Sequence, residues 1–296
     1  MAKPIVKWAG GKTRLVPKLL ERIPSEVRTY VEPFAGGAAL FFALASGVDA
    51  GTRKVSRAIL ADQNEELIAC YRAVKDDVDA VIEALGAYRY DKDLFYETRD
   101  RDTRAMTDVA RAARLLFLNR TCFNGLWRVN ASGKFNVPFG RYKNPRILNE
   151  ARLRTASAAL ARTKLVRGDF AQATRGLGEG DFVYFDPPYA PVSKTAAFTT
   201  YAAGGFDHDD QLRLVAELRR LRDCGALAML SNADTPETRA LYADFAVHVV
   251  HVPRSINSDV TKRGDAREVI VTSWGKKGVR EELATRSRMA RAAPIR

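Results

Sequence analysis

A carboxylate, two prolines and an aromatic ring stand in a row at Asp186-Pro187-Pro188-Tyr189. Residues 182–185 before them are apolar and partly aromatic, which predicts a buried strand that ends at Asp186. Each proline fixes its own φ and lacks an N–H, so the backbone carbonyls here stay stiff and outside any ladder. Asp186 and one such carbonyl could accept both hydrogens of an exocyclic amino group while Tyr189 stacks on the ring. The motif is a candidate clamp for a flat amine; taken alone, it is equally well an ordinary turn with an Asp cap.

The charge of the chain favours a polyanionic partner. Lys and Arg number 48 against 35 Asp and Glu, which gives a formal net charge of +13 and a pI near 9.8. The excess is concentrated in residues 111–149, a segment without any acidic residue. Its basic residues are Arg111, Arg114, Arg120, Arg128, Lys134, Arg141, Lys143 and Arg146, and they alternate with Asn and aromatic residues. Basic groups neutralise phosphates, aromatic rings stack on bases, and Asn and Arg read base edges, so we expect this segment to contact nucleic acid.

Strands and helices are predicted to alternate around these two features. Residues 29–33 form a predicted strand that runs into the glycine turn Phe34-Ala35-Gly36-Gly37-Ala38, and a helix follows over 39–44. A second strand over 58–61 ends at Asp62, an acid placed to bind ribose hydroxyls at the carboxyl edge of a parallel sheet. Further predicted strands lie at 164–167, 182–185, 226–230, 247–252 and 268–273, and further helices at 64–74, 151–160 and 209–222.

Metal sites and membrane spans find no support in the sequence. The chain has an odd number of scattered cysteines, namely Cys70, Cys122 and Cys224, and its three histidines lack the spacing of metal ligands. We therefore expect a reduced, cytoplasmic protein without a metal. No stretch approaches the ~20 apolar residues that a membrane helix needs, and the first residues lack the apolar run of a signal peptide. We expect no membrane association and a monomer in solution.

Four groups of residues occur in the order typical of one enzyme family. They are Lys7-Trp8-Ala9-Gly10-Gly11-Lys12; Glu32-Pro33-Phe34-Ala35-Gly36-Gly37; Asn124-Gly125-Leu126-Trp127-Arg128-Val129-Asn130 with Phe135-Asn136-Val137-Pro138-Phe139-Gly140-Arg141-Tyr142; and Asp186-Pro187-Pro188-Tyr189. Together they closely resemble the Dam family of DNA adenine-N6 methyltransferases. The resemblance runs from Lys7 to about Trp274 and includes Ser231-Asn232 and residues 254–256. The glycine turn departs from the methyltransferase pattern Phe-x-Gly-x-Gly at Ala38.

The resemblance implies an α/β fold with two parts. The first is a Rossmann-like methyltransferase domain with a mostly parallel seven-stranded sheet, formed by residues 1–75 and 149–274. The second is an inserted, mainly helical DNA-recognition domain over residues 76–148. A basic tail over 275–296 would either follow DNA phosphates or act as a disordered, solubilising segment.

The resemblance also implies S-adenosylmethionine (SAM) as the cofactor. The residues expected around it are Trp8, Ala9, Gly10, Lys12, Phe34, Gly36, Asp62, Asp169, Phe170 and Asp186. Asp62 would hold the ribose, and Asp169 with Phe170 would contact the adenine ring of SAM.

The implied substrate is double-stranded DNA, methylated at N6 of a flipped-out adenine within GATC. Asp186, Pro187 and Tyr189 would hold that adenine as the catalytic residues. The residues expected to bind DNA are Lys7, Phe123, Asn124, Leu126, Arg128, Asn136, Pro138 and Arg141. Phe123 would fill the vacated space, and Arg128 would bind a guanine.

Three alternatives stay open at this point. The same chemistry could act on another short adenine-containing site. A methyltransferase of RNA or protein amines could use a related turn, although relatives that methylate protein glutamine typically carry Asn where this chain has Asp186. A DNA-binding protein without catalysis would need neither Asp62 nor the glycine turn.

Overall fold

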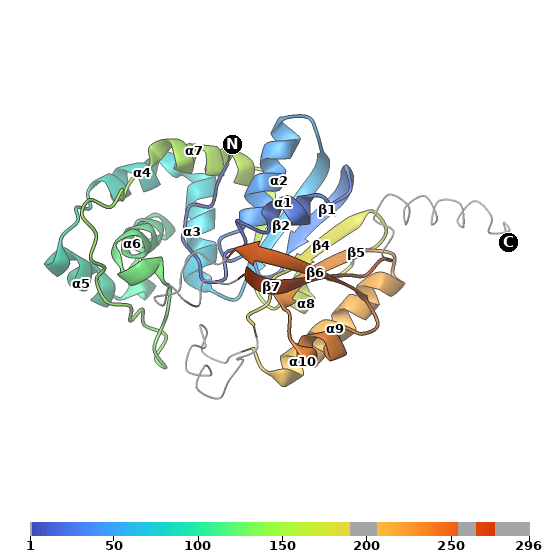
Figure 1. Cartoon of the computed structure of the whole chain (residues 1–296). Helices are drawn as coiled ribbons and strands as arrows, with labels where there is room; N and C mark the ends of the chain where they lie inside the picture. Colours follow the sequence, from blue (N-terminus) through green and yellow to red (C-terminus); the bar gives the residue numbers. More distant parts are fainter. Residues whose placement is uncertain (1, 190–205, 254–264, 276–296) are drawn as a thin grey trace, which may run out of the picture.

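One seven-stranded sheet organises the computed structural model, which describes residues 2–189, 206–253 and 265–275 (Figure 1). The strand order is β3-β2-β1-β4-β5-β7-β6. The strands are β1 Glu26–Glu32, β2 Lys54–Asp62, β3 Thr163–Arg167, β4 Asp181–Phe185, β5 Leu227–Ala233, β6 Ala246–Pro253 and β7 Asp265–Thr272. Strands β1 to β5 pair in parallel, and β7 is antiparallel to both β5 and β6. The predicted mostly parallel, seven-stranded sheet is confirmed.

The strand order reverses between β1 and β4. The chain proceeds from β1 outward to β2 and β3, returns to β4 beside β1, and continues to β5 on the other side. At such a switch point the loops that leave the carboxyl ends of the two strands diverge and open a crevice. Glu32 ends β1 and Phe185 ends β4, so the glycine turn and Asp186 both begin at this crevice.

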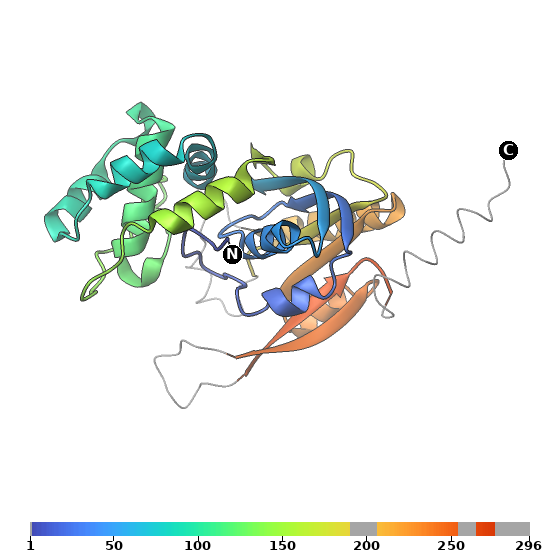
Figure 2. The ribbon, with the colours of Figure 1, turned by 90° about the horizontal axis from the view of Figure 1, so that it is seen from above.

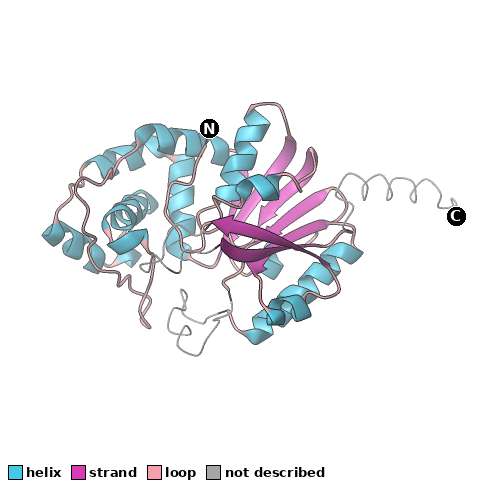
Figure 3. Ribbon diagram, viewed as in Figure 1, coloured by secondary structure: helices cyan, strands magenta, loops and turns pink. Residues whose placement is uncertain are grey.

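The central strands β4 and β5 are mostly apolar because helices cover both faces of the sheet. Tyr30 and Phe182 pack into one core cluster, and their neighbours Val31 and Val183 pack into the other. The first face is covered by α1 Val16–Leu20 and α2 Ala39–Asp49, and the second by α8 Phe170–Ala173, α9 His208–Asp223 and α10 Pro236–Leu241 (Figures 1 and 3). The predicted helices that begin at 39 and 209 are confirmed.

Helices make up the other side of the molecule (Figures 2 and 3). They are α3 Glu65–Asp76, α4 Val78–Gly86, α5 Lys92–Asp100, α6 Asp108–Thr121 and α7 Glu150–Leu160. Each begins after a residue whose side chain accepts a hydrogen bond from the first turn, which is typical of helix N-caps. These caps are Asn64, Asp77, Asp91, Thr107 and Asn149. The predicted helices at 64–74 and 151–160 are confirmed.

Helix α3 belongs to both parts of the molecule. It packs against β2 and β3 on one side and against α6 on the other, and the sheet and the helical part share one continuous core cluster. The predicted domain boundary at residue 76 falls at the end of this shared helix, and the division into two domains stays a prediction. Residues 254–256 and the tail from residue 276 lie outside the described residues.

Candidate active site

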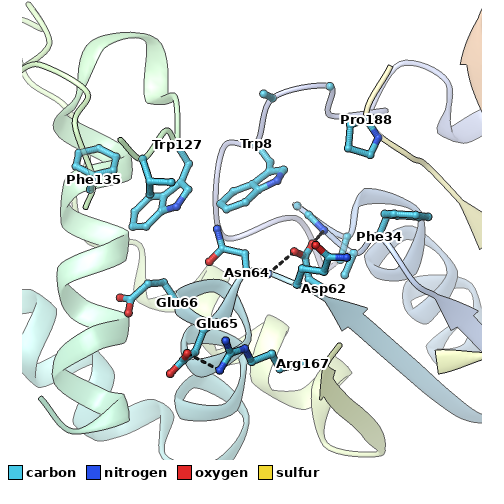
Figure 4. Close-up of a pocket in the computed structure, with 18 of the residues that line it drawn as sticks. Trp8, Phe34, Asp62, Asn64, Glu65, Glu66, Trp127, Phe135, Arg167 and Pro188 are labelled. Carbon is cyan, nitrogen blue, oxygen red and sulfur yellow. Dashed lines mark hydrogen bonds and ion pairs between the residues drawn. The ribbon is translucent and has the colours of Figure 1, made fainter. Parts of the chain in front are cut away.

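A cavity of about 1510 Å³ lies along the carboxyl ends of β1, β2 and β4 and extends toward the helical part (Figure 4). On the sheet side it is lined by residues 8–12, by the glycine turn, by Asp62 and by residues 186–189. On the helical side it is lined by residues 99–104, Trp127 and residues 132–135. The structure therefore brings three predicted motifs, which are far apart in the sequence, into one space.

Asp186 is held at the end of β4 by contacts from two directions. Its Oδ1 lies 2.9 Å from Lys12 Nζ and accepts a hydrogen bond from Ser231 Oγ at 3.1 Å. Ser231 is itself 2.8 Å from the hydroxyl of Tyr184. Burial raises the pKa of Asp186, and the charge of Lys12 together with both hydrogen bonds opposes that rise. These contacts fall on Oδ1 and fix the direction in which Oδ2 points.

Lys12 is a buried cation with three neighbours. The residue is 8% exposed, and Nζ donates to the Gly10 carbonyl at 2.7 Å. Nζ also pairs with Asp186 and lies 4.6 Å from the ring centre of Tyr189. Burial lowers the pKa of Lys12, but the neighbouring Asp186 and Tyr189 outweigh it and hold that pKa above its usual range. The sequence predicts Lys12 beside the cofactor, and the structure places it against the catalytic motif.

Glu32 is a second acidic group in the cavity wall, and the sequence analysis assigned it no role. It is 2% exposed and accepts a hydrogen bond from the Tyr30 hydroxyl at 2.5 Å. Burial raises the pKa of Glu32 to about 8, the nearby Asp186 adds to the rise, and the hydrogen bonds oppose it. Burial thus favours the neutral form of Glu32 around neutral pH, whereas the ion pair with Lys12 favours the charged form of Asp186. The one feature of the sequence that could have indicated this role is the position of Glu32, an acid at the end of the strand before the glycine turn.

Asp62 ties the tip of β2 to the glycine turn. Its Oδ2 accepts the Gly36 N–H at 2.9 Å, and its Oδ1 accepts the Asn64 N–H at 2.9 Å (Figure 4). Burial raises the pKa of Asp62, and these backbone hydrogen bonds lower it. Each carboxylate oxygen has a further lone pair. Contact with ribose hydroxyls stays a prediction that this geometry permits.

The glycine turn has a backbone that favours residues without a side chain. Gly36 has a φ of +44°, and a Cβ there would lie 2.7 Å from Cδ1 of Trp8. Ala38 has a φ of 49°, although it is not glycine. At Ala38, where the sequence departs from the methyltransferase pattern, the backbone is thus left-handed. This conformation costs ~1–2 kcal/mol for an L-residue.

Asp169 and Phe170 lie beside the cavity, behind its lining. Asp169 caps α8 and forms an ion pair of 2.8 Å with Arg213. Phe170 is buried and packs on two rings that do line the cavity, Phe34 at 5.6 Å and Phe206 at 6.3 Å between ring centres. Phe34 and Phe206 therefore separate the Phe170 ring from the cavity. The predicted contact of Asp169 and Phe170 with the adenine ring of SAM stays a prediction, and for Phe170 it would need these two rings to shift.

The predicted DNA-binding residues gather on a hairpin that follows α6, formed by residues 122–139 and called here the recognition hairpin. Its arms are joined by bridges between Cys122 and Phe139 and between Val129 and Phe135. The hairpin carries Phe123, Asn124, Leu126, Arg128, Asn136 and Pro138. Phe123 is 51% exposed, a large apolar side chain left in solvent.

Two polar contacts organise this surface. Arg128 Nε donates to Asn136 Oδ1 at 2.8 Å across the arms of the recognition hairpin. Asn119 binds the backbone of Lys7 in both directions, at 2.8 Å each, and so fixes the predicted DNA contact Lys7 beside the hairpin. Arg141 is exposed just beyond the hairpin. All eight predicted DNA-binding residues thus lie in or next to one structural unit.

Three of the basic residues in segment 111–149 point inward. Arg111 pairs with the first turn of α3, at 2.7 Å from Glu66, and Arg120 donates to the Ile5 carbonyl at 2.6 Å. Arg114 is 3% exposed and donates to the backbone carbonyls of Thr98 and Arg99. The expectation that the whole segment displays its charge to nucleic acid is wrong for these three, because they compensate acids and carbonyls of neighbouring elements. The exposed members are Arg128, Lys134, Arg141, Lys143 and Arg146.

The described ranges contain no group of three or more His, Cys, Asp or Glu side chains that could hold a metal ion. No helix within these same residues is long and apolar enough to cross a membrane.

Several known DNA methyltransferases are similar to this chain over most of its length. The type II methyltransferase M1.LlaDCHI of Lactococcus lactis subsp. cremoris is 41% identical over 281 residues, which cover 92% of this chain and 96% of that protein. The type II methyltransferase M.MjaIII of Methanocaldococcus jannaschii is 41% identical over 281 residues, covering 89% and 96%. The DNA adenine methylase of Escherichia coli K12 is 34% identical over 272 residues, covering 90% and 94%.

The model of one protein family, the D12 class N6 adenine-specific DNA methyltransferases, matches residues 8–256. This range includes the loop before α1, the glycine turn, the recognition hairpin and the catalytic motif. The match confirms the predicted enzyme class and leaves the rival classes of RNA or protein methyltransferase and non-catalytic DNA-binding protein without support. The chain belongs to the D12 class N6 adenine-specific DNA methyltransferase family.

Proposed function

We propose that this enzyme extrudes an adenine from duplex DNA and methylates its N6 while Asp186, Pro187 and Tyr189 hold the base. We further propose GATC as its site, because the recognition residues resemble those of the Dam family. The observation that carries the proposal is the position of Asp186. It lies in the same cavity as the glycine turn and Asp62, at the carboxyl ends of neighbouring strands.

The cavity suits SAM in size and in the groups that line it. Gly36 has no side chain, which lets the Trp8 ring lie directly against the turn, and Asp62 offers carboxylate lone pairs to ribose hydroxyls. Trp8 and Phe34 offer apolar ring faces from either side of the turn (Figure 4). When bound, SAM supplies an electrophilic methyl group on a sulfonium.

Asp186 prepares the nucleophile in this account. The lone pair of adenine N6 is delocalised into the ring, which makes N6 a poor nucleophile. Oδ2 of Asp186 and the carbonyl of Pro187 accept the two N6 hydrogens, which draws the nitrogen toward sp3 geometry and aims its lone pair. Lys12 and Ser231 hold Oδ1, so the carboxylate keeps its orientation. Positioning and electrostatics supply the rate, and Asp186 need not be a strong base because the proton becomes acidic only as the product forms.

Phe123 is the proposed wedge that replaces the extruded base. Extrusion costs a few kcal/mol of stacking and pairing. The exposed ring of Phe123 at the base of the recognition hairpin can recover part of this cost in the duplex, while Tyr189 recovers another part in the cavity. An aromatic ring that stacks on a base contributes about 1–3 kcal/mol.

Removing the wedge is expected to hinder extrusion. In a duplex with 2-aminopurine at the target position, Phe123→Ala should reduce the fluorescence increase on binding, and the methylation rate should fall by about 5- to 150-fold, as 1–3 kcal/mol of stacking implies. Phe123→Tyr keeps the ring and should behave like the wild type. Equal fluorescence increases for Phe123→Ala and wild type would exclude the wedge role.

Arg128 and Asn136 are expected to act together in reading one base. With Nε tied to Asn136, Arg128 can present its two terminal nitrogens to a guanine. Arg128→Ala should lower discrimination at one base pair by about 1–3 kcal/mol. Asn136→Ala should lower it less, because the guanidinium remains but loses its orientation. The measurement is kcat/KM on duplexes with single base changes in GATC.

The control for this pair is Lys143→Ala, an exposed cation outside the hairpin that should weaken all duplexes alike. A loss of discrimination spread evenly over all positions of the site in Arg128→Ala would contradict the assignment.

The proposed function is tested by supplying purified enzyme and SAM with a GATC duplex, a duplex without GATC, the same sequence as RNA, and a peptide. Mass spectrometry of the digested products should find N6-methyl-2′-deoxyadenosine from the GATC duplex and no methylated product from the other three substrates. Equal methylation of the duplex without GATC would refute the proposed site, and a methylated base other than adenine would refute the proposed reaction.

A further inference from the structure

Two tryptophans from distant parts of the chain stack across the cavity. Trp8 precedes α1, Trp127 belongs to the recognition hairpin, and their ring centres lie 6.1 Å apart with an angle of 18° between the planes (Figure 4). Both rings line the cavity. Trp127 is 3% exposed and also packs on Phe135 of the opposite arm, at 4.7 Å between ring centres. The stack therefore joins the sheet side of the cavity to both arms of the hairpin.

Trp8 rests directly on the glycine turn. The space that a Cβ of Gly36 would need is taken by the Trp8 ring, 2.7 Å away. Gly36 is in turn fixed through its N–H by Asp62 and through its carbonyl by the Tyr71 hydroxyl at 2.7 Å. A movement of this turn toward Trp8 when a ligand enters the cavity must therefore displace the Trp8 ring, because packed groups cannot overlap.

Trp127 has an unused donor in the cavity wall. Its Nε1 is buried and makes no hydrogen bond with any of the described residues. Buried donors are satisfied in the large majority of cases, by protein or by ordered water. A ligand oxygen in the cavity could accept this N–H directly or through a water. Trp127 also stands between Leu126 and Arg128, two residues that are proposed to read the DNA.

We propose that the Trp8–Trp127 stack couples the cofactor cavity to the recognition hairpin, so that a bound cofactor tightens binding of the specific DNA site. Trp127 is then a positioning residue for target recognition. By linkage, the specific DNA tightens cofactor binding by the same factor. This inference rests on the proposed function in one respect, namely that the recognition hairpin reads DNA.

The test measures the coupling factor in the full-length protein. The Kd for a fluorescent GATC duplex is determined with and without saturating S-adenosylhomocysteine, and the ratio of the two values is the coupling factor. Wild type should give about 5- to 150-fold, the range typical of coupled sites. Trp127→Leu should bring the ratio close to one, and Trp127→Phe, which preserves an aromatic stack, should keep most of it. Circular dichroism confirms that each variant is folded.

A second variant protects the test against a folding defect in Trp127→Leu. Trp8→Leu interrupts the same stack from the other side, and the double variant should lose no more coupling than either single one, because neighbouring residues that act together are not additive. The matched control is Phe139→Leu. Phe139 anchors the other end of the hairpin on Tyr90 and Phe95, away from the stack, and its replacement should leave the ratio as in wild type.

Three results would overturn the proposal. The first is a coupling factor of one in wild type, and the second is a coupling factor in Trp127→Leu that equals the wild-type factor. The third is an equal loss of coupling in Phe139→Leu, since it would assign the coupling to general hairpin stability. Failure of the proposed function has a different signature. In that case the wild type would not prefer the GATC duplex over an unrelated one, and Arg128→Ala would change neither affinity.

Discussion

Replacing Asp186 by Asn is expected to lower the single-turnover rate of methyl transfer by about 100- to 1000-fold, the effect typical of removing one preorganised electrostatic group. The Asn amide has the shape of the carboxylate but only one acceptor oxygen instead of two. It also leaves Lys12 without its anionic partner. DNA binding should change only a few-fold, because the recognition hairpin is untouched. Rapid-quench measurement with a GATC duplex gives the rate, and band-shift titration gives the affinity.

The control for this variant is Asp244→Asn, an exposed acid that pairs with Arg219 and does not line the cavity. It should keep the rate of methyl transfer within a few-fold of wild type. If Asp186→Asn transfers methyl groups at more than a tenth of the wild-type rate, Asp186 does not hold N6 as proposed.

Replacing Lys12 by Met is expected to shift the pH dependence of catalysis upward. Lys12 opposes the effect of burial on the pKa of Asp186, so its removal raises that pKa further. The active form of Asp186 is the carboxylate, which predominates above its pKa. The variant should therefore need a higher pH than the wild type to reach its full rate. Single-turnover rates between pH 6 and 9 measure this shift.

The same change is expected to destabilise the fold. The side chains of Lys12 and Asp186 are 7% and 21% exposed, and removal of one partner from a buried ion pair costs about 3–5 kcal/mol. Urea unfolding at pH 7 measures the loss. Lys12→Arg keeps a cation and should restore most of the pH profile. An unchanged midpoint of the pH profile in Lys12→Met would show that Lys12 does not control the charge of Asp186.

The sheet was predictable from the sequence because a buried strand is marked by a short run of consecutive apolar residues. Strand β4 is buried at every position and apolar or aromatic after Asp181, since both faces of the sheet are covered, and the glycine turn marks the end of β1. Strand β5 shows where such reasoning stops. The prediction ended at 230, before the first polar residue, whereas the strand continues to Ala233 because its last three residues pair with β7. The short helices α1, α8 and α10 were not predicted, since four to six residues show too little periodicity.

The members of the site were predictable by motif, but their mutual contacts were not. Lys12 and Asp186 lie 174 positions apart in the sequence. Their pairing depends on how the loop before α1 folds over β4. The raised pKa of Glu32 depends on complete burial, which a single strand end does not reveal. The inward direction of Arg111 and Arg114 follows from the packing of α6 on α3, and charge counting treats these residues like exposed ones.

The central claim is that this protein methylates adenine N6 in DNA at one short sequence with Asp186 in the catalytic position. It is tested most directly by expressing the protein in cells that lack adenine methylation and mapping methylated adenines across the genome. Methylated adenines should occur within GATC after expression of the wild type and be absent after expression of the folded Asp186→Ala variant. Methylated adenines that persist with Asp186→Ala, or a genome that stays unmethylated although the wild type is expressed and folded, would contradict the account.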